Sequence, residues 1–179
     1  MSQNEMAKVE VYELTVPQMI RSLEGLKGVL KKAQVHFADR KTDFAVVAQQ
    51  RLTPDMFPLG KQIQIATDTA KGCVARLMGE KPPVFEDNES TYEQFVSRID
   101  RTIAYLQSAR PEQFAKWEEQ VIRFPWYPGH HLKGRAFLVQ HALPNFYFHC
   151  TTAYAILRQH GVLVGKADFL GQQDWLKDT

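Results

Sequence analysis

The sequence has little cysteine and lacks the catalytic signatures that depend on fixed spacing. Cys73 and Cys150 are its only two cysteines, and they form no CxxC pair. They predict buried, reduced thiols rather than a disulfide framework or a zinc-ligand pair. The sequence also contains no phosphate-binding glycine loop, no HExxH motif and no Ser-His-Asp order signature. These absences argue against P-loop nucleotide-binding proteins, HExxH metalloproteases and serine hydrolases.

A large charge of one sign is also absent. The 22 basic and 20 acidic residues give a formal net charge of +2, which argues against a dedicated nucleic-acid binder. No apolar segment follows the polar start of the chain, so we expect no signal peptide or membrane anchor and a cytoplasmic location. The length predicts a single domain over residues 1–179. We expect residues 1–12 and 172–179 to be poorly ordered.

The longest stretch without charge organises the rest of the chain. Residues 136–157 hold no Asp, Glu, Lys or Arg, although 23% of the residues are charged. Several polar side chains make the stretch unsuited to a membrane span, so we expect the most buried helix of an all-α domain, with a kink near Pro144. His141, Asn145 and His149 recur at steps of four and would form a polar stripe on one face of this helix.

Apolar residues recur at helical spacing in three further segments, each with start or stop signals. The first helix is predicted from a capping box at Thr15–Gln18 to Ala38, the second from Asp55 or Met56 to Gly79, and the third from a capping box at Ser90–Glu93. A short helix at 44–47 and a hairpin of strands at 121–124 and 130–132 complete the prediction. The fold class is therefore an all-α four-helix bundle with a small hairpin-like insertion before the last helix.

Five segments carry a resemblance to a known family. They are PDMFPL at 54–59, QIQIATDTAK at 62–71, LPNFYFH at 143–149, TAYAILR at 152–158 and GKADFLG at 165–171. The sequence resembles an uncharacterised bacterial family of the DinB/YfiT-like superfamily. The resemblance implies an up-down-down-up bundle and a homodimer. It also implies a divalent metal held by three histidines, one on the second helix and two on the fourth, and thiol-dependent transferase or isomerase chemistry in some relatives.

This sequence departs from the superfamily's metal pattern. Aligned on the end of the last helix, His149 falls on the second histidine of the pair, Asn145 falls on the first, and Gln62 falls near the ligand position of the second helix. The resemblance thus gives Gln62, Asn145 and His149 as the metal set, with His141 as a further imidazole. Amide oxygens are weak ligands for zinc or nickel, so we expect at most a weakly bound divalent metal. Tyr147 joins the three residues in the expected small-molecule pocket.

Two functions remain open from the sequence. The first is a DinB-like bundle protein whose metal or small-molecule site between the second and fourth helices is degenerate. The second is a metal- or thiol-dependent transferase or isomerase-type enzyme, with His149 as the best catalytic candidate because imidazole changes charge near neutral pH. Asp68 also has two interpretations: it pairs on the surface with Lys71 or Arg76, or it faces inward as a functional acid.

Overall fold

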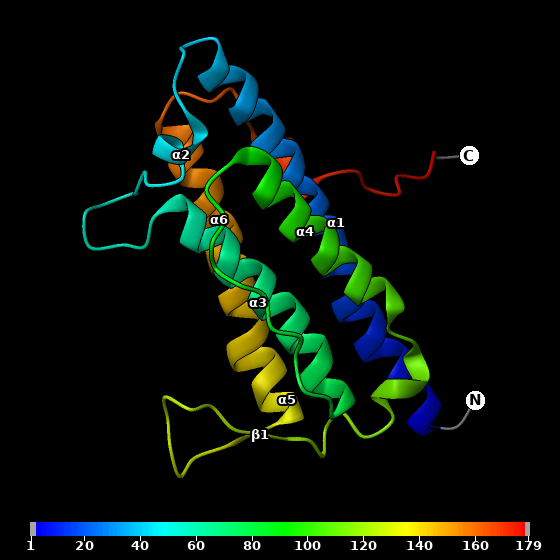
Figure 1. The fold of residues 1–179 in the computed structure, drawn as a ribbon. Helices are drawn as coiled ribbons and strands as arrows, with labels where there is room; N and C mark the ends of the chain where they lie inside the picture. The colour runs from blue at the N-terminus through cyan, green and yellow to red at the C-terminus, as the bar shows by residue number, and fades with distance from the viewer. Residues whose placement is uncertain (1–2, 178–179) are drawn as a thin grey trace.

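The computed structural model describes residues 3–177, with side chains from Glu10 onward. Within these residues four long helices form an all-α bundle (Figure 1). They are α1 (Gln3–Ala38), α3 (Leu59–Met78), α4 (Tyr92–Ser108) and α6 (Leu143–Gln159). The shorter helical elements are α2 (Phe44–Val47), η1 (Pro111–Phe114), α5 (Gly134–Ala136), η2 (Phe137–Ala142) and α7 (Lys166–Leu170). The expected poor order of residues 1–12 and 172–179 falls partly outside the described residues and stays a prediction.

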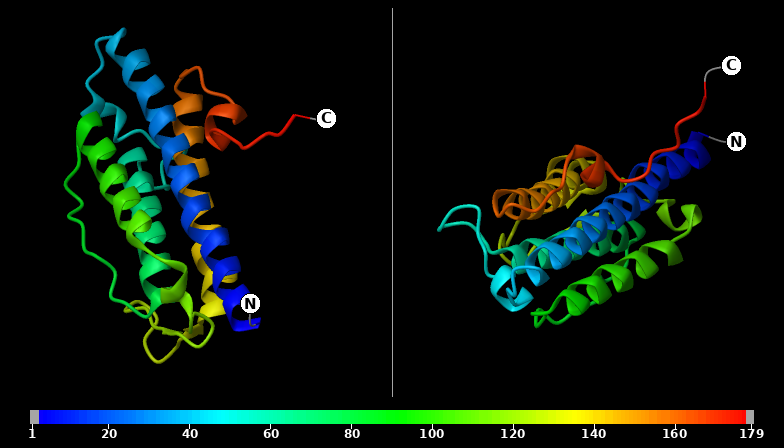
Figure 2. Two further views of the ribbon diagram at one scale, coloured as in Figure 1. Left: turned by 90° about the vertical axis from the view of Figure 1, so that its right-hand side faces the viewer. Right: turned by 90° about the horizontal axis from the view of Figure 1, so that it is seen from above.

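The long helices run up, down, down and up, as predicted (Figures 1 and 2). Because α3 and α4 point in the same direction, the chain between them must travel back along the whole bundle. Residues 79–91 make this crossing as an extended segment on the outside of the helices. The short helix predicted at 44–47 is present. Within the described residues, no helix combines the length and the apolar character needed to cross a lipid bilayer.

The first helix begins earlier than predicted. Helix α1 starts at Gln3 and continues through Thr15, whose fully buried hydroxyl donates to the carbonyl of Val11 one turn back, at 2.6 Å. The predicted capping box at Thr15–Gln18 is therefore wrong. Val11 and Met19 are buried on either side of Thr15, so packing of the apolar stripe extends the helix upstream of this residue.

The second long helix, by contrast, begins later than predicted, at Leu59 instead of Asp55 or Met56. Pro58 is the cap residue, in an extended conformation with φ −70° and ψ 164°. A proline disfavours helical geometry in the residue before it, which keeps Phe57 outside the helix. The predicted end is confirmed.

Capping chemistry sets the ends that face the crossing segment. Gly79 ends α3 with a left-handed φ of 79°, a conformation that glycine adopts without a Cβ penalty. Thr91 caps α4: its hydroxyl accepts from the Gln94 backbone N–H at 3.3 Å, and the Gln94 side chain accepts from the Thr91 N–H at 3.0 Å. The capping box thus lies one residue beyond the predicted Ser90–Glu93 box.

The predicted break near Pro144 takes the form of a widened turn. Proline has no backbone N–H to continue the helical ladder. Just before it, the N–H of Leu143 bonds to the carbonyl of Leu138, five residues back, which makes η2 a π-helical turn leading into α6. The predicted hairpin is confirmed in shortened form, with β1 (Val121–Ile122) pairing antiparallel with β2 (Leu132–Lys133).

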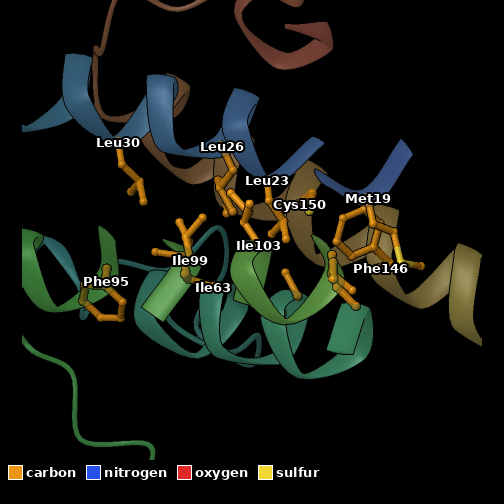
Figure 3. Close-up of a cluster of buried hydrophobic side chains, with 14 of the residues drawn as sticks. Met19, Leu23, Leu26, Leu30, Ile63, Phe95, Ile99, Ile103, Phe146 and Cys150 are labelled. Carbon is orange, nitrogen blue, oxygen red and sulfur yellow. The ribbon is translucent and has the colours of Figure 1, made fainter. Parts of the chain in front are cut away.

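Apolar side chains from all four long helices meet in one core (Figure 3). The prediction that 136–157 forms the most buried helix is wrong, because α3 has more buried residues than α6. Val139 on η2 and Tyr147 and Phe148 on α6 are 58%, 37% and 54% exposed. Helix α6 packs mainly against α3, which leaves its opposite face uncovered. The uncharged stretch 136–157 therefore includes an exposed face as well as a buried one.

Candidate functional site

A buried polar pair joins α3 to α6. Gln62 on α3 is 1% exposed and His149 on α6 is 7% exposed. The Nδ1 atom of His149 lies 2.6 Å from Oε1 of Gln62. The amide nitrogen of Gln62 donates to the carbonyl oxygen of Phe57 at 2.9 Å. Since that carbonyl can only accept, the Gln62 oxygen must face His149, and Nδ1 must carry the hydrogen.

This tautomer leaves the second ring nitrogen of His149 with a lone pair. Burial lowers the pKa of His149 to about 4, because desolvation disfavours the charged imidazolium. The ring is therefore neutral at physiological pH. No side chain or backbone group of the described residues hydrogen-bonds Nε2, so this atom is a proton acceptor held in a fixed orientation.

Replacing His149 with glutamine should flatten the acid limb of the stability profile. The folded-state pKa of about 4 lies below the ordinary value of 6.5, so the unfolded chain binds more protons between these values. The contribution of His149 is fully present above pH 6.5 and is lost as pH falls toward 4, by on the order of 2 kcal/mol. Urea unfolding from pH 4 to 7 measures the difference between the wild type and His149→Gln.

The exposed Thr151 on the same helix supplies a control for this measurement. Thr151→Gln should keep the wild-type pH dependence. Equal slopes for the wild type and His149→Gln would contradict the assignment of a buried neutral imidazole.

The structure brings two of the three predicted ligands together and separates the third. The side-chain amide of Asn145 donates to the Thr69 hydroxyl at 2.9 Å. Thr69 lies seven residues beyond Gln62 on α3, about 10 Å along the helix axis. The polar stripe on α6 is thus divided between two partners: His149 meets Gln62, and Asn145 meets Thr69.

The other two predicted residues lie elsewhere. Tyr147 is on the outer face of α6, 37% exposed, with its ring 5.2 Å from that of Phe146. The His141 ring lies 4.7 Å from the ring of Phe124 and 5.9 Å from that of Phe137. Burial, and then the nearby Arg76 charge, lower the pKa of His141.

Each polar pair borders its own hollow. Gln62 lines a small hollow of about 170 Å³ with residues of the loop before α3 and with Phe148. Asn145, Thr69 and His141 line a larger cleft of about 690 Å³ on another part of the surface. The expected single pocket between the second and fourth helices is therefore two separate hollows.

The donor set does not fit a transition metal. Nδ1 of His149 is occupied by Gln62, and the amide of Asn145 is turned to Thr69, which leaves one imidazole nitrogen and no carboxylate or thiolate beside it. Among the described residues, no three His, Cys, Asp or Glu side chains are grouped to hold a metal ion. Zinc and nickel sites in proteins need more nitrogen or sulfur ligands than this.

The structure also contains a charged cluster that was not predicted. Arg98 on α4 is fully buried and forms ion pairs with Asp68 at 2.6 Å, Asp87 at 3.0 Å and Glu89 at 2.9 Å. Asp68 also pairs with Lys71 at 2.9 Å, which agrees with the first of the two interpretations of Asp68, pairing with Lys71 or Arg76. The signal in the sequence is the position of Arg98, which lies on the buried stripe of α4 among apolar residues.

The all-α bundle of up-down-down-up order is the fold that the resemblance to the DinB/YfiT-like superfamily implied. Residues 11–170 match a family described as "Domain of unknown function (DUF1993)", and the chain belongs to this family. It is similar to the crystal structure of a DinB family member protein from Shewanella denitrificans, with 39% identity and a TM-score of 0.93 over 98% of this chain and 100% of that one. No curated protein matches the sequence.

Proposed function

We propose that the protein is a DinB-like bundle in which the ancestral metal or small-molecule site between α3 and α6 is degenerate. The 2.6 Å contact between Gln62 and His149 carries this proposal. It supports a structural role, because a hydrogen bond between two buried side chains satisfies polar groups that would be costly to leave unpaired. Two buried free cysteines are consistent with work in the reducing cytoplasm.

Metal analysis of freshly purified protein tests the proposal. We expect less than one zinc, nickel or other transition metal per chain, the same low content in His149→Ala, and a loss of about 1–3 kcal/mol in the free energy of unfolding of that variant. Stoichiometric metal in the wild type, lost in His149→Ala without a change in stability, would overturn it.

One observation favours a second candidate, a thiol- or metal-dependent transferase or isomerase-type enzyme. The unprotonated Nε2 of His149 is held by a fixed tautomer, which suits a general base. Such an enzyme should turn over a thiol substrate, with activity lost in His149→Gln while the fold is kept. If the wild type conjugates none of bacillithiol, mycothiol and glutathione, the enzyme hypothesis loses its support and the degenerate site remains the favoured function.

We further propose that the protein forms a homodimer through the outer face of α6. Apolar Tyr147 and Phe148 are exposed there beside Thr151, in a stretch without any charge. Exposed apolar patches mark interaction surfaces. A twofold interface places a patch against its own copy, and an uncharged patch meets no like-charge repulsion in doing so. A second copy of this chain is therefore the partner that fits.

Phe148→Glu should convert this dimer to a monomer, because it would place two carboxylates at the centre of the twofold contact. Light scattering coupled to size-exclusion chromatography measures the mass directly. Leu163→Glu is the matched control, since Leu163 is 81% exposed outside this face, and this variant should stay dimeric. A monomeric wild type at high micromolar concentration would contradict the proposal.

A further inference from the structure

The 690 Å³ cleft is not used by the proposed function. It lies between α3, the π-helical turn η2 and the first part of the crossing segment, with aromatic residues from the hairpin at its edge. Clefts of about 300–1,000 Å³ are of the size that holds small molecules. π-Helical turns are also frequent at functional sites.

The charge available in the cleft is positive. Arg76, Lys81, Lys71 and Asp68 contribute to its lining. Asp68 is bound by both Lys71 and Arg98, so its carboxylate is already matched. Within the described part of the chain, Arg76 and Lys81 have no carboxylate partner. A guanidinium that is half-buried without a counterion favours binding of an anion.

The helix backbone makes room for this guanidinium. Gly72 lies one turn before Arg76 on α3, and a Cβ added at Gly72 would overlap the Nη1 atom of Arg76. The guanidinium lies 5.5 Å from the ring centre of Phe124. The absence of a side chain at Gly72 therefore lets Arg76 fold back along the helix, with its charge beside an aromatic wall.

The walls of the cleft are aromatic. Phe124 and Trp126 are stacked, with ring centres 4.6 Å apart and planes 26° apart. The rings of His141 and Phe137 continue this surface, and Phe85 of the crossing segment also lines the cleft. Aromatic rings prefer offset-stacked or edge-to-face packing, and a flat ligand can make either contact with these rings.

Two polar groups near the same wall have unused hydrogen-bonding capacity. The Thr69 hydroxyl accepts from Asn145, so its own hydrogen is free to donate, and no acceptor for it is found among the described residues. The Asn145 carbonyl oxygen can still accept. The guanidinium of Arg76 folds back to the level of Gly72, which is three residues from Thr69 on α3. A carboxylate bound there would thus have the Thr69 hydroxyl as a second donor about one turn away.

We propose that this cleft binds a small planar anion of the aromatic carboxylate class. The carboxylate binds Arg76, with Thr69 as a second donor, and the ring packs against Phe124 and Trp126. The inference is independent of the proposed function, since it uses neither Gln62 nor His149.

Calorimetric titration with benzoate and 1-naphthoate, and with the uncharged 1-naphthamide, tests the proposal. We expect 1-naphthoate to bind with a Kd in the micromolar to low millimolar range. The uncharged 1-naphthamide should bind at least about tenfold more weakly. Equal affinity for carboxylate and amide, or no binding of either carboxylate at millimolar concentration, would overturn it.

Two variants assign the site. Arg76→Met should weaken naphthoate binding about tenfold, and Gly72→Ala should weaken it by displacing the guanidinium. Alanine favours the helix more than glycine, so Gly72→Ala should melt no lower than the wild type, which separates lost binding from lost folding. Lys31→Met, which removes an exposed charge on α1, should bind normally. Wild-type affinity in both Gly72→Ala and Arg76→Met would contradict the assignment.

Discussion

Replacing Arg98 with methionine should lower the free energy of unfolding by about 3–5 kcal/mol. The side chain of Arg98 is fully buried, and Glu89, one of its three carboxylate partners, is only 5% exposed. Its Nε also donates to the buried Thr67 hydroxyl at 2.7 Å. Without the guanidinium, the Glu89 carboxylate stays buried with no positive charge beside it, and the Thr67 hydroxyl loses its donor. Leaving these groups unpaired costs more free energy than the ion pairs themselves contribute.

Arg101 provides the matched control, because it lies on the same helix but is exposed. Its guanidinium only covers the ring of Phe85, 4.3 Å from the ring centre. Arg101→Met should change the unfolding free energy by less than about 1 kcal/mol. Urea denaturation of both variants at neutral pH measures the difference. Similar losses at the two positions would show that burial of the charge cluster is not what makes Arg98 important.

The second large effect is expected for Phe146→Ala, also about 3–5 kcal/mol. Phe146 is 0% exposed and belongs to the core cluster with Met19 and Cys150 (Figure 3). Removing the ring would leave a cavity that the surrounding helices can fill only partly, and the lost packing adds to the lost transfer free energy.

Phe148, two residues along the same helix, is the control for this measurement. It is 54% exposed, so Phe148→Ala should cost less than about 1 kcal/mol in dilute protein, where the proposed dimer is dissociated. Thermal and urea unfolding at submicromolar concentration compare the two. A larger cost at Phe148 than at Phe146 would contradict the orientation of α6.

The paired phenylalanines show what the sequence could and could not predict. Apolar periodicity located the long helices, and Gly79 correctly marked one end, because these signals act within a few residues. The orientation of α6 was harder to predict. Absence of charge on 136–157 indicated burial, yet a face that is neither charged nor buried gives the same pattern in the sequence. Only the packing of α6 against α3 separates Phe146 from Phe148.

The candidate site was predicted in part for a similar reason. The spacing of four residues correctly placed Asn145 and His149 on one side of α6. It said nothing about the register of α3 opposite, where the two partners, Gln62 and Thr69, are seven residues apart. Adjacent turns of one helix thus face different residues of the next. The register is decided by tertiary packing, which no local pattern in the sequence contains.

The Arg98 cluster escaped prediction because its members come from three places. Asp68 lies on α3, Arg98 on α4, and Asp87 and Glu89 on the crossing segment. A lone arginine on an apolar stripe is visible in the sequence, but its partners depend on where the crossing segment lies.

The crossing segment offers the family a way to diversify its large cleft. Two long helices that point the same way oblige the chain to run the length of the bundle between them, and residues 81–85 of this run form one wall of the large cleft. A wall built from a connector evolves more freely than one built from a packed helix. Selection can therefore alter what the cleft accepts while the bundle beneath it stays the same.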